Sequence, residues 1–145
     1  MNDLMIFKNK EFGKLKNIKK DNDYMGFFYA IEYGELIKIG STNNPYQRVM
    51  ALKRQAEKYG NIKMGNLVLS KQHTNYFENE RKLHTYYKNK RKNGTELFNI
   101  TINEFCKNIS KTNIEYKNQT KDIENKSEKF CNMMKSFILG GNINE

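Results

Sequence analysis

In the first half of the chain, short apolar segments are separated by turns. Residues 26–32 and 35–40 are rich in aromatic and β-branched side chains and flank Gly34, which is the pattern of two strands joined as a β-hairpin. Residues 65–70 form a third apolar segment of strand length. We therefore expect an α/β protein of the α+β type, with a small three-stranded antiparallel sheet flanked by helices.

Three longer segments have the three- and four-residue apolar spacing of amphipathic helices. The first spans residues 45–59 and follows a polar loop that can cap it. The second spans about residues 74–90. The third, residues 101–110, opens with a capping box in which Thr101 and Glu104 lie three residues apart. These segments supply the helical layer that covers the sheet.

The two ends of the chain differ from this central part. Residues 1–25 predict a short helix or irregular arm that packs on the core, with a basic lead-in to a substrate as the alternative. Residues 111–145 predict a polar linker followed by an amphipathic helix that covers the domain or forms a homodimer contact. We therefore expect the main domain at residues 26–110. The apolar stripe near the C-terminus consists of Phe130, Met133, Met134, Phe137 and Ile138.

A carboxylate interrupts the apolar and aromatic face of the second predicted helix. Glu80 shares this face with residues that include Leu83 and His84. Burying an unpaired carboxylate costs several kcal/mol or shifts its pKa. Glu80 therefore either pairs with a basic residue of its own helix (Lys82, Lys88 or His84) or points into a site where it meets a cation.

Positive charge is concentrated in the main domain. The formal net charge is +10, with 26 Lys and Arg against 16 Asp and Glu. Residues 81–92 hold the densest basic run and contain no acid. Clustered positive charge favours a nucleic-acid partner, although the Lys/Asn/Ile-rich composition of an AT-rich genome is the alternative explanation. The residues that we expect to contact DNA are Lys53, Arg54, Arg81, Lys88, Arg91 and Lys92.

Several other classes of protein are disfavoured. The two cysteines, Cys106 and Cys131, form no CxxC motif and have no histidines at zinc-ligand spacing, which argues against a zinc site or a disulfide scaffold. The N-terminal apolar run is too short for a signal peptide, and no segment approaches the ~20 apolar residues of a membrane span. We therefore expect an intracellular, cytoplasmic protein with no membrane partner.

The predicted hairpin and the helix after it resemble the signature of the GIY-YIG nuclease superfamily. Phe27-Phe28-Tyr29 stands at the first motif of the family, with Phe27 in place of its glycine. Lys38-Ile39-Gly40 stands at the second motif, and Arg48 follows Gly40 at the spacing of the family arginine. Many members have tyrosine at the position of Lys38. A subgroup of small phage, viral and bacterial domains is similar to this chain in reading Lys-Ile-Gly.

The second half of the resemblance rests on fewer residues. In the Lys-Ile-Gly subgroup, a glutamate on the second helix is followed four residues later by histidine, then by a basic loop and a Glu-aromatic-Phe-like turn. This chain has Glu80, His84, the loop 91–94 and the sequence Glu96-Leu97-Phe98 at the corresponding places. The resemblance covers about residues 26–105. We interpret Glu96 as a turn acid with no catalytic part.

The resemblance implies a DNA endonuclease that depends on Mg²⁺ (or Mn²⁺), with Glu80 as the metal ligand. Hydrolysis of a phosphodiester needs a nucleophile and neutralisation of the phosphate oxygens. Arg48 is expected to clamp the scissile phosphate, and Tyr29 to orient or deprotonate the attacking water. Lys38 either lowers the pKa of Tyr29 or holds a phosphate. His84 is a candidate proton shuttle.

Other interpretations of the same residues remain open. In these interpretations, Tyr29 is an aromatic residue that packs in the sheet, Arg48 is a surface arginine, and Lys38 is an ordinary charge at the edge of the sheet. Because Lys38 replaces a tyrosine, a nucleic-acid-binding module that keeps the fold without cutting is the alternative function. An adaptor role centred on the stripe at residues 130–138 is a third. The Lys/Asn/Ile-rich composition suits a phage or a mobile element.

Overall fold

The computed structural model describes residues 3–118. In chain order, its helices and strands are β1 (Leu4–Phe7), η1 (Asn9–Asn17), β2 (Phe27–Tyr33), β3 (Leu36–Thr42), α1 (Pro45–Arg54), η2 (Gln55–Tyr59), β4 (Met64–Ser70), α2 (Tyr76–Tyr86), η3 (Lys88–Lys90), β5 (Leu97–Phe98), α3 (Ile102–Asn108) and η4 (Ile109–Lys111). The strands form an antiparallel sheet in the order β1-β4-β2-β3-β5. The expected α+β architecture is confirmed, with five strands in place of three.

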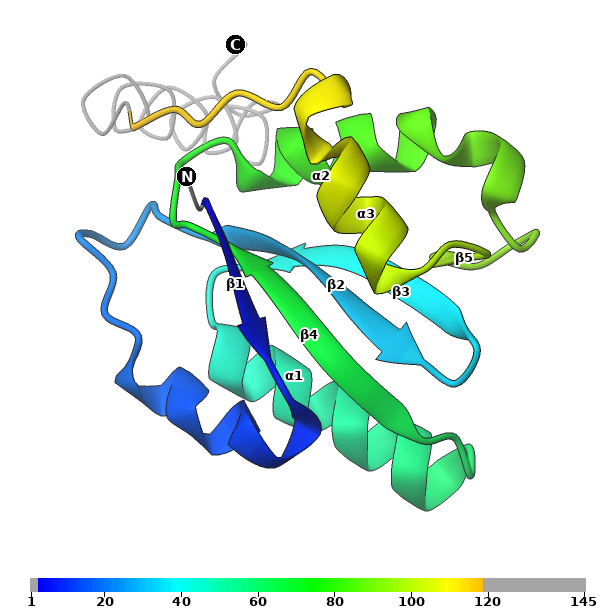
Figure 1. Cartoon of the computed structure of the whole chain (residues 1–145). Helices are drawn as coiled ribbons and strands as arrows, with labels where there is room; N and C mark the ends of the chain where they lie inside the picture. The colour runs from blue at the N-terminus through cyan, green and yellow to red at the C-terminus, as the bar shows by residue number, and fades with distance from the viewer. Residues whose placement is uncertain (1–2, 119–145) are drawn as a thin grey trace, which may run out of the picture.

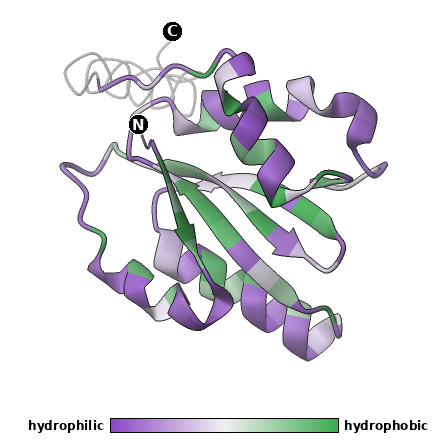
Figure 2. Ribbon diagram, viewed as in Figure 1, coloured by the Kyte–Doolittle hydropathy of each residue, from purple (hydrophilic) through white to green (hydrophobic). Residues whose placement is uncertain are grey.

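Helices cover both faces of the sheet (Figure 1). The 3₁₀ helix η1 and α1 lie on one face, and α2 and α3 lie on the other. Because successive side chains of a strand point to opposite faces, β2 contributes Tyr29 and Ile31 to the core under α1 and Phe28 and Ala30 to the core under α2. Figure 2 shows this apolar content concentrated along the strands. β2 is therefore the central strand that serves two cores.

The predicted hairpin is formed by β2 and β3. Gly34 takes the left-handed conformation that the turn requires, with φ of 66°. The register places Tyr29 directly opposite Gly40, and Phe28 opposite Ser41. Gly40 and Ser41 consequently face opposite sides of the sheet. This register positions the candidate site described below.

The two additional strands lie at the edges of the sheet. β1 occupies part of the segment for which the sequence predicts a helix or irregular arm, and η1 follows it. The strand pairs with β4 through Leu4 to Phe7. β5 has two residues and pairs with Ile37 and Lys38 of β3. Both strands are too short to show a period-two pattern, so their partners in the sheet define them.

The predicted helices are present with shorter bounds. α1 ends at Arg54 and continues as a π-helical segment, η2, to Tyr59. α2 begins at Tyr76 and gives way to the 3₁₀ turn η3 after Tyr86. In α3, the side chain of Thr101 accepts a hydrogen bond from the Glu104 amide at 3.0 Å, which confirms the predicted N-cap.

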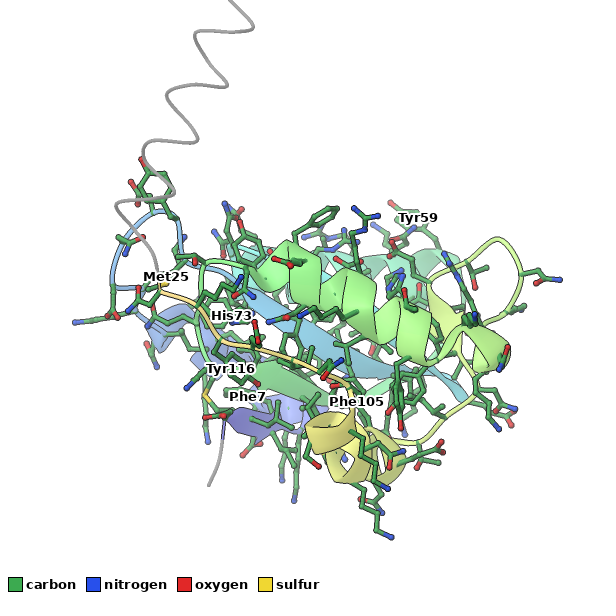
Figure 3. The ribbon with its side chains drawn as sticks, turned by 90° about the horizontal axis from the view of Figure 1, so that it is seen from above. Phe7, Met25, Tyr59, His73, Phe105 and Tyr116 are labelled. Atoms are coloured by element: carbon green, nitrogen blue, oxygen red, sulfur yellow. The ribbon has the colours of Figure 1, made fainter. Side chains whose placement is uncertain are left out.

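Residues 112–118 return across the α2 side of the domain. The side-chain amides of Asn75 and Asn79 donate to the Glu115 carbonyl at 2.7 and 2.9 Å. Figure 3 shows Tyr116 beside His73, and their ring centroids are 4.9 Å apart. This part of the predicted extension therefore packs on the core.

Residues 119–145 lie outside the described residues, and the predicted apolar stripe at 130–138 with its dimer contact lies among them. Within residues 3–118, no helix combines the length and the apolar character needed to cross a membrane.

Candidate functional site

The outer edge of β3 is open where the strand ends. β5 pairs with Ile37 and Lys38 only, so no strand of the described chain pairs with the outer edge of Gly40 to Thr42. Because Gly40 has no side chain, the Tyr29 ring can lie over it: a Cβ atom at Gly40 would be 2.6 Å from Tyr29 Cζ. The Tyr29 side chain is 1% exposed, yet its hydroxyl reaches this edge.

Arg48 reaches the same hydroxyl from α1. The helix starts at Pro45, and its N-cap residue Asn44 accepts a hydrogen bond from the Gln47 amide at 3.2 Å. Arg48 lies in the first turn, and its Nε donates to the Tyr29 hydroxyl oxygen at 3.2 Å. Since Arg48 is exposed, its remaining guanidinium N–H groups are available to an anion from solvent.

Burial raises the pKa of Tyr29, although the hydrogen bond and the positive charge of Arg48 lower it. The charges of Glu96 and Glu80 also raise it. The phenol is therefore protonated at neutral pH, and its own O–H can donate while its oxygen accepts from Arg48. Lys38 is not among the causes of this shift, so the pKa of Tyr29 gives no support to the alternative in which Lys38 lowers it.

The Arg48 guanidinium is also affected by this environment. Partial burial lowers its pKa, but the hydrogen bond with Tyr29 and the charges of Tyr29, Glu96 and Glu80 outweigh that effect and raise it. Arg48 consequently carries its charge at every pH at which the protein is folded. A phosphate that approaches this edge meets a permanent cation beside a neutral phenol.

Glu80 approaches the edge from α2, on the other face of the sheet. The Ser41 hydroxyl donates to Glu80 Oε1 at 2.5 Å. His84 Nε2 lies 3.5 Å from Glu80 Oε2 and 2.9 Å from the carbonyl oxygen of Ile39. Because a carbonyl oxygen can only accept, His84 Nε2 carries a proton in this contact. Glu80 is thus held by Ser41 and His84.

The two lysines considered as partners for Glu80 are placed differently. Lys82 donates to the carbonyl oxygen of Asn113 at 3.0 Å, and the described residues show no ion pair of Lys88 with Glu80. His84 is the one candidate partner that lies beside the carboxylate. The Glu80 carboxylate keeps lone pairs beyond those that face Ser41 and His84.

Adjacent residues of β3 bring the two faces together. The Tyr29–Arg48 pair lies over Gly40 on the α1 side, and Glu80 accepts a hydrogen bond from Ser41 on the α2 side. Consecutive Cα atoms are about 3.8 Å apart, so both groups flank one short piece of the edge. The influence of Glu80 on the pKa of Tyr29 and of Arg48 agrees with this proximity. Glu80 lies across the sheet from Tyr29 but at the same edge.

Lys38 and Glu96 complete the arrangement. Lys38 Nζ lies 3.4 Å from Glu96 Oε1. The charge of Glu96 also raises the pKa of Tyr29 and of Arg48, which places it beside the pair and not in an isolated turn. Sequence reasoning left out Ser41 and gave Glu96 no part. The alternation of side chains along the strand indicates that Ser41 faces the side of the sheet opposite to Gly40. Glu96 comes close to the site only because β5 pairs with β3.

The residues of this edge fit one type of metal site. Within residues 3–118, no group of three or more His, Cys, Asp and Glu side chains could hold a metal ion. Mg²⁺, however, is commonly bound through one or two carboxylates and substrate phosphate and keeps several of its waters. Glu80, oriented by the Ser41 hydroxyl, fits the role of a single carboxylate ligand of this kind.

The predicted DNA-contacting residues are distributed over both helical layers. Lys53 donates to Asn9 Oδ1 at 2.7 Å and lies 5.8 Å from the centre of the Phe12 ring, so it fastens η1 to α1. Arg91 donates to the Thr95 carbonyl oxygen at 2.5 Å. The others, Arg54, Arg81, Lys88 and Lys92, are exposed.

Comparison with known proteins gives a family and no individual relative. No curated protein and no solved structure matches the chain. The model of the T5orf172 domain matches residues 25–113, which begin just before β2 and end just after η4. The match contains every residue of the candidate site but does not test the resemblance to GIY-YIG nucleases. Because it covers more than half of the 145 residues, the chain belongs to the family of the T5orf172 domain, a phage-associated domain found in nuclease-like proteins.

Proposed function

We propose that this chain is a Mg²⁺- or Mn²⁺-dependent endonuclease of the GIY-YIG type, which hydrolyses DNA phosphodiester bonds at the open edge of β3. The observation that carries the proposal is the convergence at Gly40 and Ser41. There the Tyr29–Arg48 pair meets a glutamate from the opposite helical layer. Membership of a family found in nuclease-like proteins supports a nucleic-acid substrate.

Each residue of the edge has a role that follows from its contacts. Arg48 binds the scissile phosphate through the guanidinium N–H groups that Tyr29 does not use. Tyr29 acts as a neutral donor that orients the attacking water or a phosphate oxygen, because its raised pKa makes it a poor base. Lys38, paired with Glu96, supplies a second positive charge for the phosphate backbone.

Glu80 would hold the metal ion, with Ser41 fixing one carboxylate oxygen and His84 lying beside the other. A bound Mg²⁺ supplies positive charge to the phosphate oxygens and lowers the pKa of a coordinated water. His84 anchors the α2 face to β3 through Ile39, and in the proposed mechanism it is the candidate proton shuttle. In this arrangement the metal ligand and the phosphate clamp come from different helices.

The proposal is tested by incubating the purified full chain with supercoiled plasmid, linear duplex and single-stranded DNA. We expect cleavage with Mg²⁺ or Mn²⁺ and none with EDTA. Glu80→Gln and Arg48→Ala should each lower the rate by roughly 10²–10³-fold, the usual cost of removing one group that stabilises a transition state. The matched controls Glu78→Gln in α2 and Lys58→Ala in η2 change exposed charged residues outside the proposed site and should keep the rate near that of the wild type.

The alternative is a nucleic-acid-binding module of the same fold that does not cut. Two observations favour it: both Glu80 oxygens already have neighbours at hydrogen-bonding or ion-pair distance, and Tyr29 is far from being a phenolate at neutral pH. This alternative predicts salt-sensitive DNA binding that survives Glu80→Gln and leaves every DNA intact with every metal. Intact DNA in the presence of demonstrable binding would therefore decide in its favour.

A further inference from the structure

Two exposed aromatic rings lie on the two sides of the α2 surface that points away from the sheet. Phe77 is 61% exposed and Tyr86 is 42% exposed. Both line a shallow hollow of about 590 Å³ that α2 forms with the chain at η4. The buried residues of α2, which include Leu83, face the sheet. Phe77 lies outside both core clusters, and Tyr86 contacts the core only through the edge of the Tyr87 ring, whose centre is 4.8 Å away. Exposed aromatic rings in a hollow are typical of binding surfaces.

Positive charge surrounds these rings. Arg81 and Lys82 of α2 and Lys111 of η4 line the same hollow, against one acid, Glu78. Within residues 3–118, no ion pair neutralises Arg81 or Lys111. Lys82 donates one hydrogen bond to the carbonyl oxygen of Asn113 and keeps its other N–H groups. The hollow therefore presents aromatic faces and uncompensated cations together.

This combination selects one kind of occupant. Bases of a single strand stack on aromatic rings while cations hold the phosphates, and this binding is tolerant of sequence. A base-paired duplex offers its phosphates but keeps its base faces stacked, so it cannot use both features. A nucleic-acid strand carries one phosphate per nucleotide to match these three cations, which a protein surface of mixed charge does not.

The length of the surface suits several nucleotides. Phe77 and Tyr86 are nine residues apart, which corresponds to about 14 Å along a helix at ~1.5 Å per residue and to about half a turn around it, so the two rings flank the outer side of α2. That distance equals about four steps of the ~3.4 Å rise of one strand, so two bases about four steps apart can stack on the two rings where the strand crosses the outer side of α2 obliquely. Phe77 precedes Glu80 by three residues, so the hollow begins next to the candidate site at β3.

We propose that the outer face of α2 binds a single-stranded nucleic-acid segment. Its bases stack on Phe77 and Tyr86, and its phosphates contact Arg81, Lys82 and Lys111. This site is separate from the edge of β3 and needs neither a metal ion nor cleavage. It goes beyond the proposed function because it gives the chain a preference for nucleic acid that contains an unpaired strand.

The experiment measures binding of the full chain by fluorescence anisotropy in EDTA. The probes are a labelled oligodeoxythymidine, a labelled oligouridine and a blunt duplex of the same length. Phe77→Ala and Tyr86→Ala should each weaken single-strand binding roughly 5- to 150-fold and leave duplex binding within about twofold, since stacking of one base contributes ~1–3 kcal/mol. Phe77→Tyr and Tyr86→Phe keep a ring and should bind like the wild type. The DNA and RNA probes show which sugar is accepted.

The matched control is Tyr59→Ala. Tyr59 is 73% exposed beside Lys58, whose Nζ lies 5.6 Å from the ring centre, but it lies outside the hollow. The control should leave single-strand binding unchanged. The proposal is overturned if the alanine variants at Phe77 and Tyr86 bind single strands as the wild type does, if duplex binding falls equally, or if Tyr59→Ala has the same effect. Binding is measured without metal, so the two proposals can fail separately. If the chain shows the expected binding pattern but cleaves no DNA, the proposed nuclease function is contradicted and the single-strand site is not.

Discussion

At Gly40, the absence of a side chain leaves the space that the Tyr29 ring occupies. We predict that Gly40→Ala destabilises the fold by about 1–3 kcal/mol, because a Cβ atom 2.6 Å from Tyr29 Cζ forces the ring or the strand to move. The displacement also breaks the alignment of the hydroxyl with Arg48, so the proposed DNA cleavage should fall roughly a hundredfold. Urea unfolding and cleavage rates measure the two effects.

Gly13→Ala is the control for this substitution. Gly13 lies in η1, and nothing is found within 4 Å of the Cβ atom that alanine would add. Its unfolding midpoint and cleavage rate should match those of the wild type. Equal stability of the Gly40 and Gly13 variants would show that the ring does not depend on this space.

The Tyr29 phenol gives a prediction about pH. Its folded pKa is raised above the ordinary ~10, mainly by burial. At high pH the unfolded chain therefore releases a proton that native Tyr29 keeps, and the contribution of this group to the free energy of unfolding falls as the pH rises above about 10. Tyr29→Phe removes this dependence, so the stability difference between wild type and variant should shrink with rising pH. Urea unfolding of both proteins at neutral and alkaline pH tests it, and a constant difference contradicts it.

The same substitution separates two roles of Tyr29. A neutral donor loses its hydroxyl in Tyr29→Phe, and cleavage should fall at every pH without a change in the shape of the pH–rate profile. A phenolate base would instead produce a rising limb near its pKa that the variant lacks. The appearance of such a limb in the wild type alone would contradict the role proposed above.

The central residues of the site could be predicted because they lie in one short stretch. Tyr29, Gly40 and Arg48 are brought together by the hairpin register and by the helix that starts at Pro45, and both features have local signals. The strand alternation indicates which side of the sheet Ser41 faces, but the partners of Ser41 and Glu96 could not be assigned in this way. Their contacts depend on long-range packing, of α2 on β3 in one case and of β5 on β3 in the other.

At the scale of elements, the start of α1 controls the position of Arg48. Asn44 caps the helix by accepting the Gln47 amide proton, and its carbonyl oxygen accepts from the Arg48 amide at 3.1 Å. We predict that Asn44→Ala destabilises the protein by about 0.5–2 kcal/mol and lowers cleavage, because the first turn frays. Asn43→Ala is the matched control, since Asn43 is an exposed neighbour that does not cap the helix. Equal melting temperatures of the two variants would contradict the role of the cap.

The longer elements were predictable and the short ones were not. The hairpin strands, β4 and the three helices are each at least seven residues long. Apolar runs of this length indicate a strand, and apolar spacing of three and four residues indicates one face of a helix. β1 and β5 have four and two residues, so their patterns cannot be told from those of a loop. They are strands because β4 and β3 offer free edges to them. The break of α1 into a π-helical turn likewise has no signal in the apolar spacing.

At the scale of the whole molecule, the sheet connects the two surfaces for which different functions are proposed. The edge of β3 combines one group from the α1 layer and one from the α2 layer, so its geometry depends on both layers being packed on β2 and β3. The outer face of α2 depends on one helix and on the chain near η4. A substitution that loosens the packing of the helices on the sheet should therefore alter the edge of β3 more than the outer face of α2.

With a net charge of +10, the proposed DNA binding should depend on salt, and the position of each charge should decide its share. Lys92 is exposed in the basic loop before β5, whereas Lys14 is exposed in η1 and lies 3.3 Å from Glu11. We predict that Lys92→Ala reduces the slope of log K against log salt for duplex DNA by about 0.9, the effect of one lost phosphate contact. Lys14→Ala removes the same formal charge and should leave the slope unchanged. Equal slopes for the two variants would show that total charge, and not the placement of the basic cluster, controls binding.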